Sequence, residues 1–202
     1  MKPRDARMWH GARTLDELGE LTARWLEGDL RSQPGYMPNH GPEPETLELI
    51  PTLAAINRLG FVTKSSQPGL FERADPTSDT SPMWWQRAGV YGFADTDLSA
   101  YLAGVAEDED LIVQRVRAVR RPWWRALTGQ APDRGYPVTG LEDDIRTHFG
   151  RPFTRRQIEF EFEGCHDKAL AALASSWQLT IIDPDAGRND RLWPLLDKVA
   201  AQ

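Results

Sequence analysis

The stretch 45–93 changes its hydrophobic period along its length, and it constrains the fold more than any other part of the sequence. Residues 45–59 carry apolar side chains at helical spacing, and Gly60 follows as the expected end of a helix. The runs 61–63 and 86–93 have the composition and length of strands. Helix and strand are mixed without strict alternation, which predicts an α+β fold with a mixed β-sheet core flanked by helices.

The other elements follow from the same periodicities and from local signals at their ends. Thr14 and Glu17 have the capping-box spacing, so a helix is expected to begin at Thr14. Pro51 removes a backbone donor, so the regular part of the second helix is expected to begin there, after an irregular turn over 45–50. Residues 157–163 alternate apolar and acidic side chains, which predicts a half-buried strand. Further helices are expected over 95–105, 166–178 and 190–200, and further strands over 111–119 and 179–182.

Composition and charge limit the partners that the chain can have. The 202 residues are 40% hydrophobic and 27% charged, which suits one globular domain over 1–202. The net charge of −6 repels phosphate backbones and anionic lipids, so no nucleic acid and no membrane surface is expected as a partner. The single Cys165 excludes an internal disulfide, and no apolar run is long enough to span a bilayer. Because the first residues lack a signal-peptide pattern, the protein is expected in the cytoplasm.

Three groups of polar residues carry chemistry but have simpler structural interpretations. The four histidines lack metal-ligand spacing, so no metal is expected. Asp183 and Asp185 suit a divalent cation, yet Asp-Pro-Asp-x-Gly is equally an ordinary turn. A basic stretch with tryptophans is suited to phosphate or nucleic acid, but the acidity of the whole chain favours a charged sheet edge. That stretch comprises Arg115, Arg117, Arg120, Arg121, Trp123, Trp124 and Arg125.

The segment from Thr63 to Gly69, Thr-Lys-Ser-Ser-Gln-Pro-Gly, carries most of the functional information. Taken alone, it is a strand running into a turn, and its hydroxyls and amide can bind backbone groups of the loop. Its context is more specific than the segment itself. The flanking motifs are Glu45-Thr46 upstream, Asn57-Arg58-x-Gly60-Phe61 just before it, and Gln86-Arg87-Ala88-x-Val90-x-x-Phe93 after it.

This combination is similar to the S-adenosylmethionine-binding regulatory domain of eukaryotic methylenetetrahydrofolate reductase. That family has Asn-Arg-x-Gly-Ile-Leu-Thr-Ile-Asn-Ser-Gln-Pro and later Gln-Lys-Ala-Tyr-Leu-Glu-Phe-Phe, with a Glu-Thr pair at the distance of Glu45-Thr46 from Thr63. The likeness is specific over 45–93 and fainter toward both ends. The chain also resembles a standalone domain family, common in actinomycetes, that shares the Trp-Leu-Glu-Gly and Ser-Gln-Pro-Gly pieces. The catalytic barrel of the reductase has no counterpart here, so neither reductase activity nor a flavin is implied.

The resemblance implies a soluble domain that binds S-adenosylmethionine or S-adenosylhomocysteine, as a sensor or regulatory module. It carries four ligand contacts over to this chain: Glu45, Thr46, Thr63 and Ser66. The carboxylate can pair with the ammonium of the ligand or accept from its ribose, and the three hydroxyls can both donate and accept. Lys64 stands where the family has Ile, and its ammonium would be unfavourable near a cationic ligand unless it points to solvent. A second copy of the chain or a partner enzyme is a possible further partner.

Two other functions stay open at this point. The domain can be a small enzyme acting on S-adenosylmethionine or a related nucleoside, because lyase or cyclisation chemistry at a sulfonium needs little more than a positioned base. Glu45 is then the first candidate base, followed by Tyr91 and His40. Alternatively, the chain is an interaction domain that has lost the ligand.

Overall fold

The computed structural model describes residues 1–118 and 135–202 of the chain. Within these residues, all strands belong to one seven-stranded sheet. The helices are α1 (Pro3–Gly11), α2 (Leu15–Leu26), the 3-10 helix η1 (Pro44–Leu49), α3 (Ile50–Arg58), α4 (Thr96–Glu107), α6 (Arg155–Glu161), α7 (Asp167–Ser175) and α8 (Leu192–Ala200). The strands are β1 (Val62–Gln67), β2 (Leu70–Arg73), β3 (Met83–Ala94), β4 (Ile112–Arg117), β5 (Tyr136–Leu141), β6 (Asp144–Phe149) and β7 (Trp177–Ala186).

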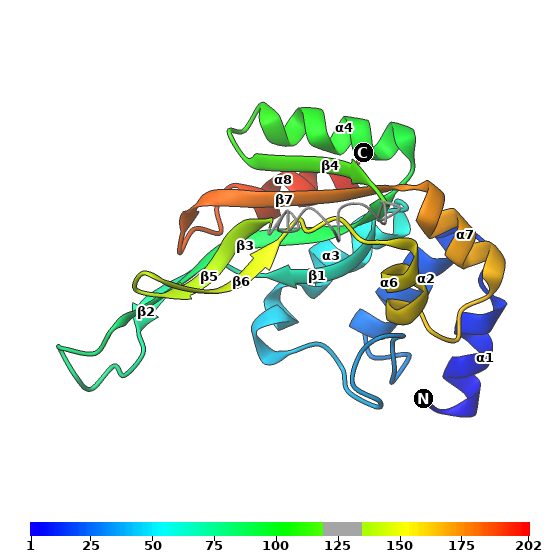
Figure 1. Ribbon diagram of the computed structural model, residues 1–202, viewed down its shortest axis with the longest axis horizontal. Helices are drawn as coiled ribbons and strands as arrows, with labels where there is room; N and C mark the ends of the chain where they lie inside the picture. The colour runs from blue at the N-terminus through cyan, green and yellow to red at the C-terminus, as the bar shows by residue number, and fades with distance from the viewer. Residues whose placement is uncertain (119–134) are drawn as a thin grey trace, which may run out of the picture.

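The long strand β3 is the centre of the sheet. Its second half pairs with β1 on one side and with β7 on the other, and β7 pairs in turn with β4. Its first half pairs with β2 and β5, and β5 pairs with β6. The hairpin formed by β2 and the start of β3 projects from the body of the molecule (Figure 1).

The α+β class predicted from the sequence is confirmed, but the sheet is not mixed. Every pairing between the described strands is antiparallel. Strands β3 and β4 are joined through α4 and run in the same direction, as a helical connection favours. They do not pair with each other, because β7 lies between them and runs antiparallel to both. A strand so distant in the sequence cannot be placed there from local patterns.

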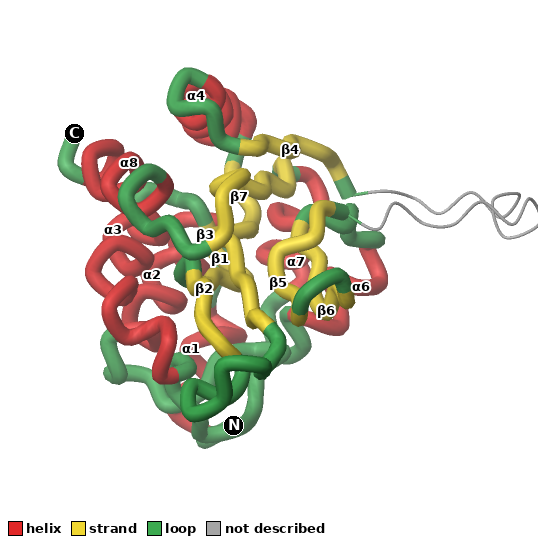
Figure 2. Tube along the Cα trace, turned by 90° about the vertical axis from the view of Figure 1, so that its left-hand side faces the viewer, coloured by secondary structure: helices red, strands yellow, loops and turns green. Residues whose placement is uncertain are grey.

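The two faces of the sheet are covered by different layers. Helices α2, α3 and α8 lie on one side of the central strands, and the β5–β6 hairpin and α6 lie on the other (Figure 2). On the first side, Val90 and Ile181 belong to the main hydrophobic core, together with residues of these helices. On the second side, the ring of Tyr91 contacts those of Phe149 and Phe153. We call these sides the helix face and the hairpin face.

Local signals placed the start of α2 and of α3 correctly. Thr14 caps α2, since its side chain accepts from the Glu17 N–H and Glu17 reaches back, as the capping box predicts. The irregular turn expected before Pro51 is η1, and α3 begins at Ile50 with this proline in its first turn. Gly60 follows α3 with φ of 98°, a left-handed conformation that glycine adopts without strain.

The strand predicted over 157–163 is wrong, because the structure forms helix α6 there. The Thr154 hydroxyl accepts from the Gln157 N–H and the Gln157 side chain reaches back, which starts a helix. Ile158 and Phe162, four residues apart, are then fully buried, whereas Phe160 is 72% exposed. The buried residues therefore follow helical spacing, although the sequence alternates like a strand. The capping box at Thr154 is the sequence signal that identifies the helix.

Candidate functional site

The first motif hydroxyl, that of Thr63, is engaged in the junction between α3 and β1. Asn57 Nδ2 donates to Thr63 Oγ1 at 2.7 Å, and the Thr63 N–H donates to Asn57 Oδ1 at 2.9 Å. Asn57 Nδ2 also donates to the Leu53 carbonyl, and the whole Asn57 side chain is buried. Thr63 itself is 6% exposed. Its hydroxyl is thus part of the framework, with only its own hydrogen left to offer.

The amide of Gln67 joins the two halves of the sheet. Its Nε2 donates to the carbonyl of Arg87 at 2.9 Å and to that of Val138 at 3.0 Å. Two residues further on, the Gly69 N–H donates to Asn189 Oδ1, and Asn189 Nδ2 donates back to the Gly69 carbonyl. The structural interpretation of the motif therefore applies to its glutamine and its glycine.

Two of the predicted site residues, Ser66 and Thr46, have hydroxyls that bond to nothing else in the described part of the chain. Ser66 is half-buried and pairs across the ladder with Val90, which places it on the helix face. Thr46 lies on η1 and is 8% exposed. Because η1 packs against β1 and α3, the structure brings the elements of these two hydroxyls together.

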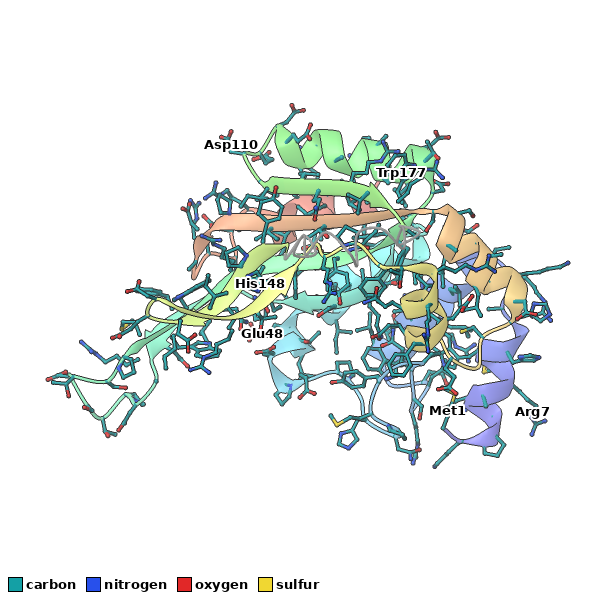
Figure 3. All side chains as sticks on the ribbon, in the orientation of Figure 1. Met1, Arg7, Glu48, Asp110, His148 and Trp177 are labelled. Carbon is teal, nitrogen blue, oxygen red and sulfur yellow. The ribbon has the colours of Figure 1, made fainter. Side chains whose placement is uncertain are left out.

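Glu45 lies beside Thr46 in the first turn of η1, in an acidic environment. Its side chain is exposed, and Glu43 next to it accepts a hydrogen bond from the Tyr36 hydroxyl. Partial burial raises the pKa of Tyr36 to about 12, and the negative charges of Glu43 and Glu45 add to this shift. Glu48, which is labelled in Figure 3, is also exposed and lies on η1 three residues after Glu45. A cationic ligand would be attracted here.

Lys64 is turned away from this surface. The register between β1 and β3 shifts between Thr63 and Ser65, so Lys64 is an extra residue in the strand. Its ammonium pairs with Glu161 of α6 at 2.8 Å and lies 5.7 Å from the ring centre of Phe162, on the hairpin face. The side chain is only 8% exposed, so it is buried against α6 and does not extend into solvent.

The three candidate bases are not equivalent in the structure. Tyr91 lies on the hairpin face, and burial, aided by the charge of Glu161, raises its pKa to about 12. His40 is exposed in the loop before η1, and its carbonyl accepts from Trp25 Nε1. Of the three, Glu45 is the residue on the same element as Thr46.

The acidic residues considered for a metal have other partners, and only part of the basic stretch lies within the described residues. Across 1–118 and 135–202, no group of three or more His, Cys, Asp or Glu side chains can hold a metal ion. Asp183 and Asp185 both bind Arg191. In the basic stretch, Arg115 and Arg117 lie on β4. Its other members, Arg120, Arg121, Trp123, Trp124 and Arg125, lie outside the described residues. None of the described helices is long and apolar enough to cross a bilayer.

Comparison with known proteins relates nearly the whole chain to one family. No curated protein matches the chain. The family model described as a domain of unknown function (DUF6919) matches residues 4–202, and the chain therefore belongs to this family.

Proposed function

We propose that this protein binds S-adenosylmethionine or S-adenosylhomocysteine at the junction of η1 and β1. The observation that carries the proposal is the pair of hydroxyls on Thr46 and Ser66. Both belong to neighbouring elements, and neither has a hydrogen-bond partner among the described residues. Neither oxygen is among the buried polar atoms that lack a partner, so both are open to solvent and free to exchange water for polar groups of a ligand.

The chemistry of the ligand agrees with the residues at this junction. The ribose diol and the carboxylate can bond to the hydroxyls of Thr46 and Ser66, which both donate and accept. The ammonium and the sulfonium are cations, and the acidic side chains of η1 attract them from solvent. Lys64, the one nearby cation on β1, is neutralised by Glu161 on the opposite face. Thr63 supports the site by fixing β1 to α3 and has a smaller direct part in binding.

Calorimetry with a matched pair of serine variants tests this proposal. Ser66→Ala removes a hydroxyl on the helix face, and Ser65→Ala removes one from the adjacent residue, which pairs with Tyr91 on the hairpin face. We expect Ser66→Ala to weaken binding of S-adenosylmethionine about tenfold, as the loss of one ligand hydrogen bond implies. Ser65→Ala should bind like the unmodified protein.

Two results would overturn the proposal. One is the absence of heat with either ligand at millimolar concentration in a folded sample. The other is equal affinity in the Ser66→Ala and Ser65→Ala variants.

The proposal concerns a sensor or regulatory module of the cytoplasm, where S-adenosylmethionine is made and used. Enzymatic conversion of the ligand is the alternative, with Glu45 as the base. Incubation with S-adenosylmethionine and detection of methylthioadenosine distinguishes the two, since a sensor releases its ligand unchanged. Tight binding with no product supports the sensor, and steady product formation that Glu45→Gln abolishes supports the enzyme.

A further inference from the structure

The indole N–H of Trp177 has no acceptor, which distinguishes it from most of the tryptophans that the structure describes. This nitrogen is buried and has no hydrogen-bond partner within residues 1–118 and 135–202. Elsewhere, indole N–H groups find acceptors: Trp9 donates to the Ser32 carbonyl, Trp25 to that of His40, Trp85 to that of Glu142 and Trp193 to Asn189 Oδ1. A buried donor without an acceptor costs free energy, so it calls for an explanation.

Two guanidiniums stack against this indole, and a guanidinium cannot accept a hydrogen bond. The guanidinium carbons of Arg115 and Arg117 lie 4.0 and 4.5 Å from the centre of the Trp177 ring. Stacking occupies the face of a guanidinium and leaves the N–H groups at its edge free to bind an anion. Arg115, Arg117 and Trp177 therefore form a cluster of donors that has no carboxylate partner among the described residues, and we call it the β4–β7 donor cluster.

Both guanidiniums are held in place by the surrounding backbone and by one hydroxyl. Arg115 donates from Nε to Ser99 Oγ and from Nη2 to the Thr96 carbonyl, both at 2.9 Å. Arg117 donates from Nη1 to the Ser175 carbonyl at 2.8 Å. These acceptors carry no charge, so both positive charges of the cluster stay available to an anion. Side chains fixed in this way lose little conformational entropy when they bind a ligand.

We propose that the β4–β7 donor cluster binds the phosphate group of a small-molecule ligand. A phosphate has several terminal oxygens and nearly two negative charges, so it can accept from the indole N–H and from both guanidiniums together. The site is separate from the η1–β1 junction, since Glu48 on η1 and Trp177 lie far apart in Figure 3. It does not depend on the proposed binding of S-adenosylmethionine.

The indole region of a proton–nitrogen correlation spectrum tests the proposal directly. Trp177→Phe identifies the Trp177 signal, and the protein is titrated with inorganic phosphate, with AMP and with adenosine. We expect phosphate and AMP to move the Trp177 indole proton downfield with saturation, because it gains an acceptor, and adenosine to leave it in place. An equal response to phosphate and AMP identifies free phosphate as sufficient, and a tighter response to AMP identifies a nucleotide.

A pair of arginine variants provides the control. Arg117→Gln should weaken the phosphate response about tenfold, as the loss of a charge-assisted hydrogen bond implies. Arg146→Gln removes the same charge from exposed β6 and should leave the response unchanged. The signals of Trp9, Trp25 and Trp193 report that each variant is folded. A Trp177 signal that never moves with phosphate, that moves equally with adenosine, or that ignores Arg117→Gln overturns the proposal and leaves water as the acceptor.

Discussion

At the scale of single residues, most of the motif that resembles the reductase domain serves the framework. Asn57 and Thr63 fix β1 to α3, and Gln67 joins the two halves of the sheet. Arg58 bonds to Glu20 of α2 and to Glu27, the residue that caps the end of α2, and so ties α3 to that helix. The resemblance at these positions is therefore evidence for a similar fold and not for a shared ligand. The proposed function depends on residues that the framework does not engage, and Ser66 is the predicted ligand contact of this kind in the motif.

The framework role of Asn57 predicts a large loss of stability when its amide is removed. Asn57→Ala leaves the buried N–H of Thr63 without an acceptor, and we expect it to lower the free energy of unfolding by about 2–4 kcal/mol. Thr63→Val keeps the shape and leaves Asn57 bonded to the Leu53 carbonyl, so about 1 kcal/mol is expected. Urea unfolding of both variants measures the difference. Equal effects would contradict the assignment of Asn57 as the central residue of this junction.

At the scale of elements, the sequence predicts what local chemistry decides. The start of α2 and the irregular turn before α3 follow from a cap and a proline. The strands predicted over 61–63 and 86–93 are found as β1 and β3, but β1 continues to Gln67 and β3 begins at Met83. The hairpin β5–β6 has little apolar periodicity of its own, since β6 is exposed over most of its length, and it was not foreseen. The site divides in the same way. The presence of hydroxyls at Thr46, Thr63 and Ser66 is visible in the sequence, but which of them is engaged depends on packing between distant elements.

The helical nature of α6 predicts unequal effects for its two phenylalanines. Phe162→Ala removes a side chain that is 1% exposed and contacts the ring of Phe93, so we expect a loss of about 3–5 kcal/mol. Phe160→Ala removes an exposed ring and should change stability by less than about 0.5 kcal/mol. In a strand over 157–163, both rings would lie on the same face and cost alike. Thermal or urea unfolding of the two variants distinguishes the cases.

At the scale of the whole molecule, the N-terminal helix is fixed to segments from both halves of the chain. Trp9 Nε1 donates to the Ser32 carbonyl, and the buried Asp5 accepts from the Arg31 N–H. On the other side, the ring of His10 lies 5.6 Å from that of His166, which precedes α7. His166 Nδ1 also accepts from the Lys168 N–H and so caps α7. The neutral His166 side chain thus caps the N-terminus of α7 and contacts α1.

This role of His166 makes stability depend on pH in a definite direction. Burial, followed by the charges of Arg13 and His10, lowers the pKa of His166 below its ordinary value of 6.5. The unfolded chain then takes up this proton before the folded one, so stability is complete above the unfolded pKa and falls as the pH decreases through it. We expect the thermal midpoint to drop between about pH 7 and pH 5, and His166→Asn, which keeps a capping side chain without the titration, to reduce this drop. An unchanged pH profile in the variant would contradict this role.

The position of β7 between β3 and β4 also sets the order in which the chain can acquire its structure during synthesis. β3 and β4 emerge from the ribosome long before Trp177, yet both need β7 as their neighbour. Until then β3 has one edge of its second half unpaired, and β4 lacks its only partner among the described strands. Both strands then expose backbone groups that can pair with other chains and cause aggregation. Contacts this distant in sequence slow folding, because the loop between them must close first. The native strand order can therefore form only after β7 has emerged from the ribosome.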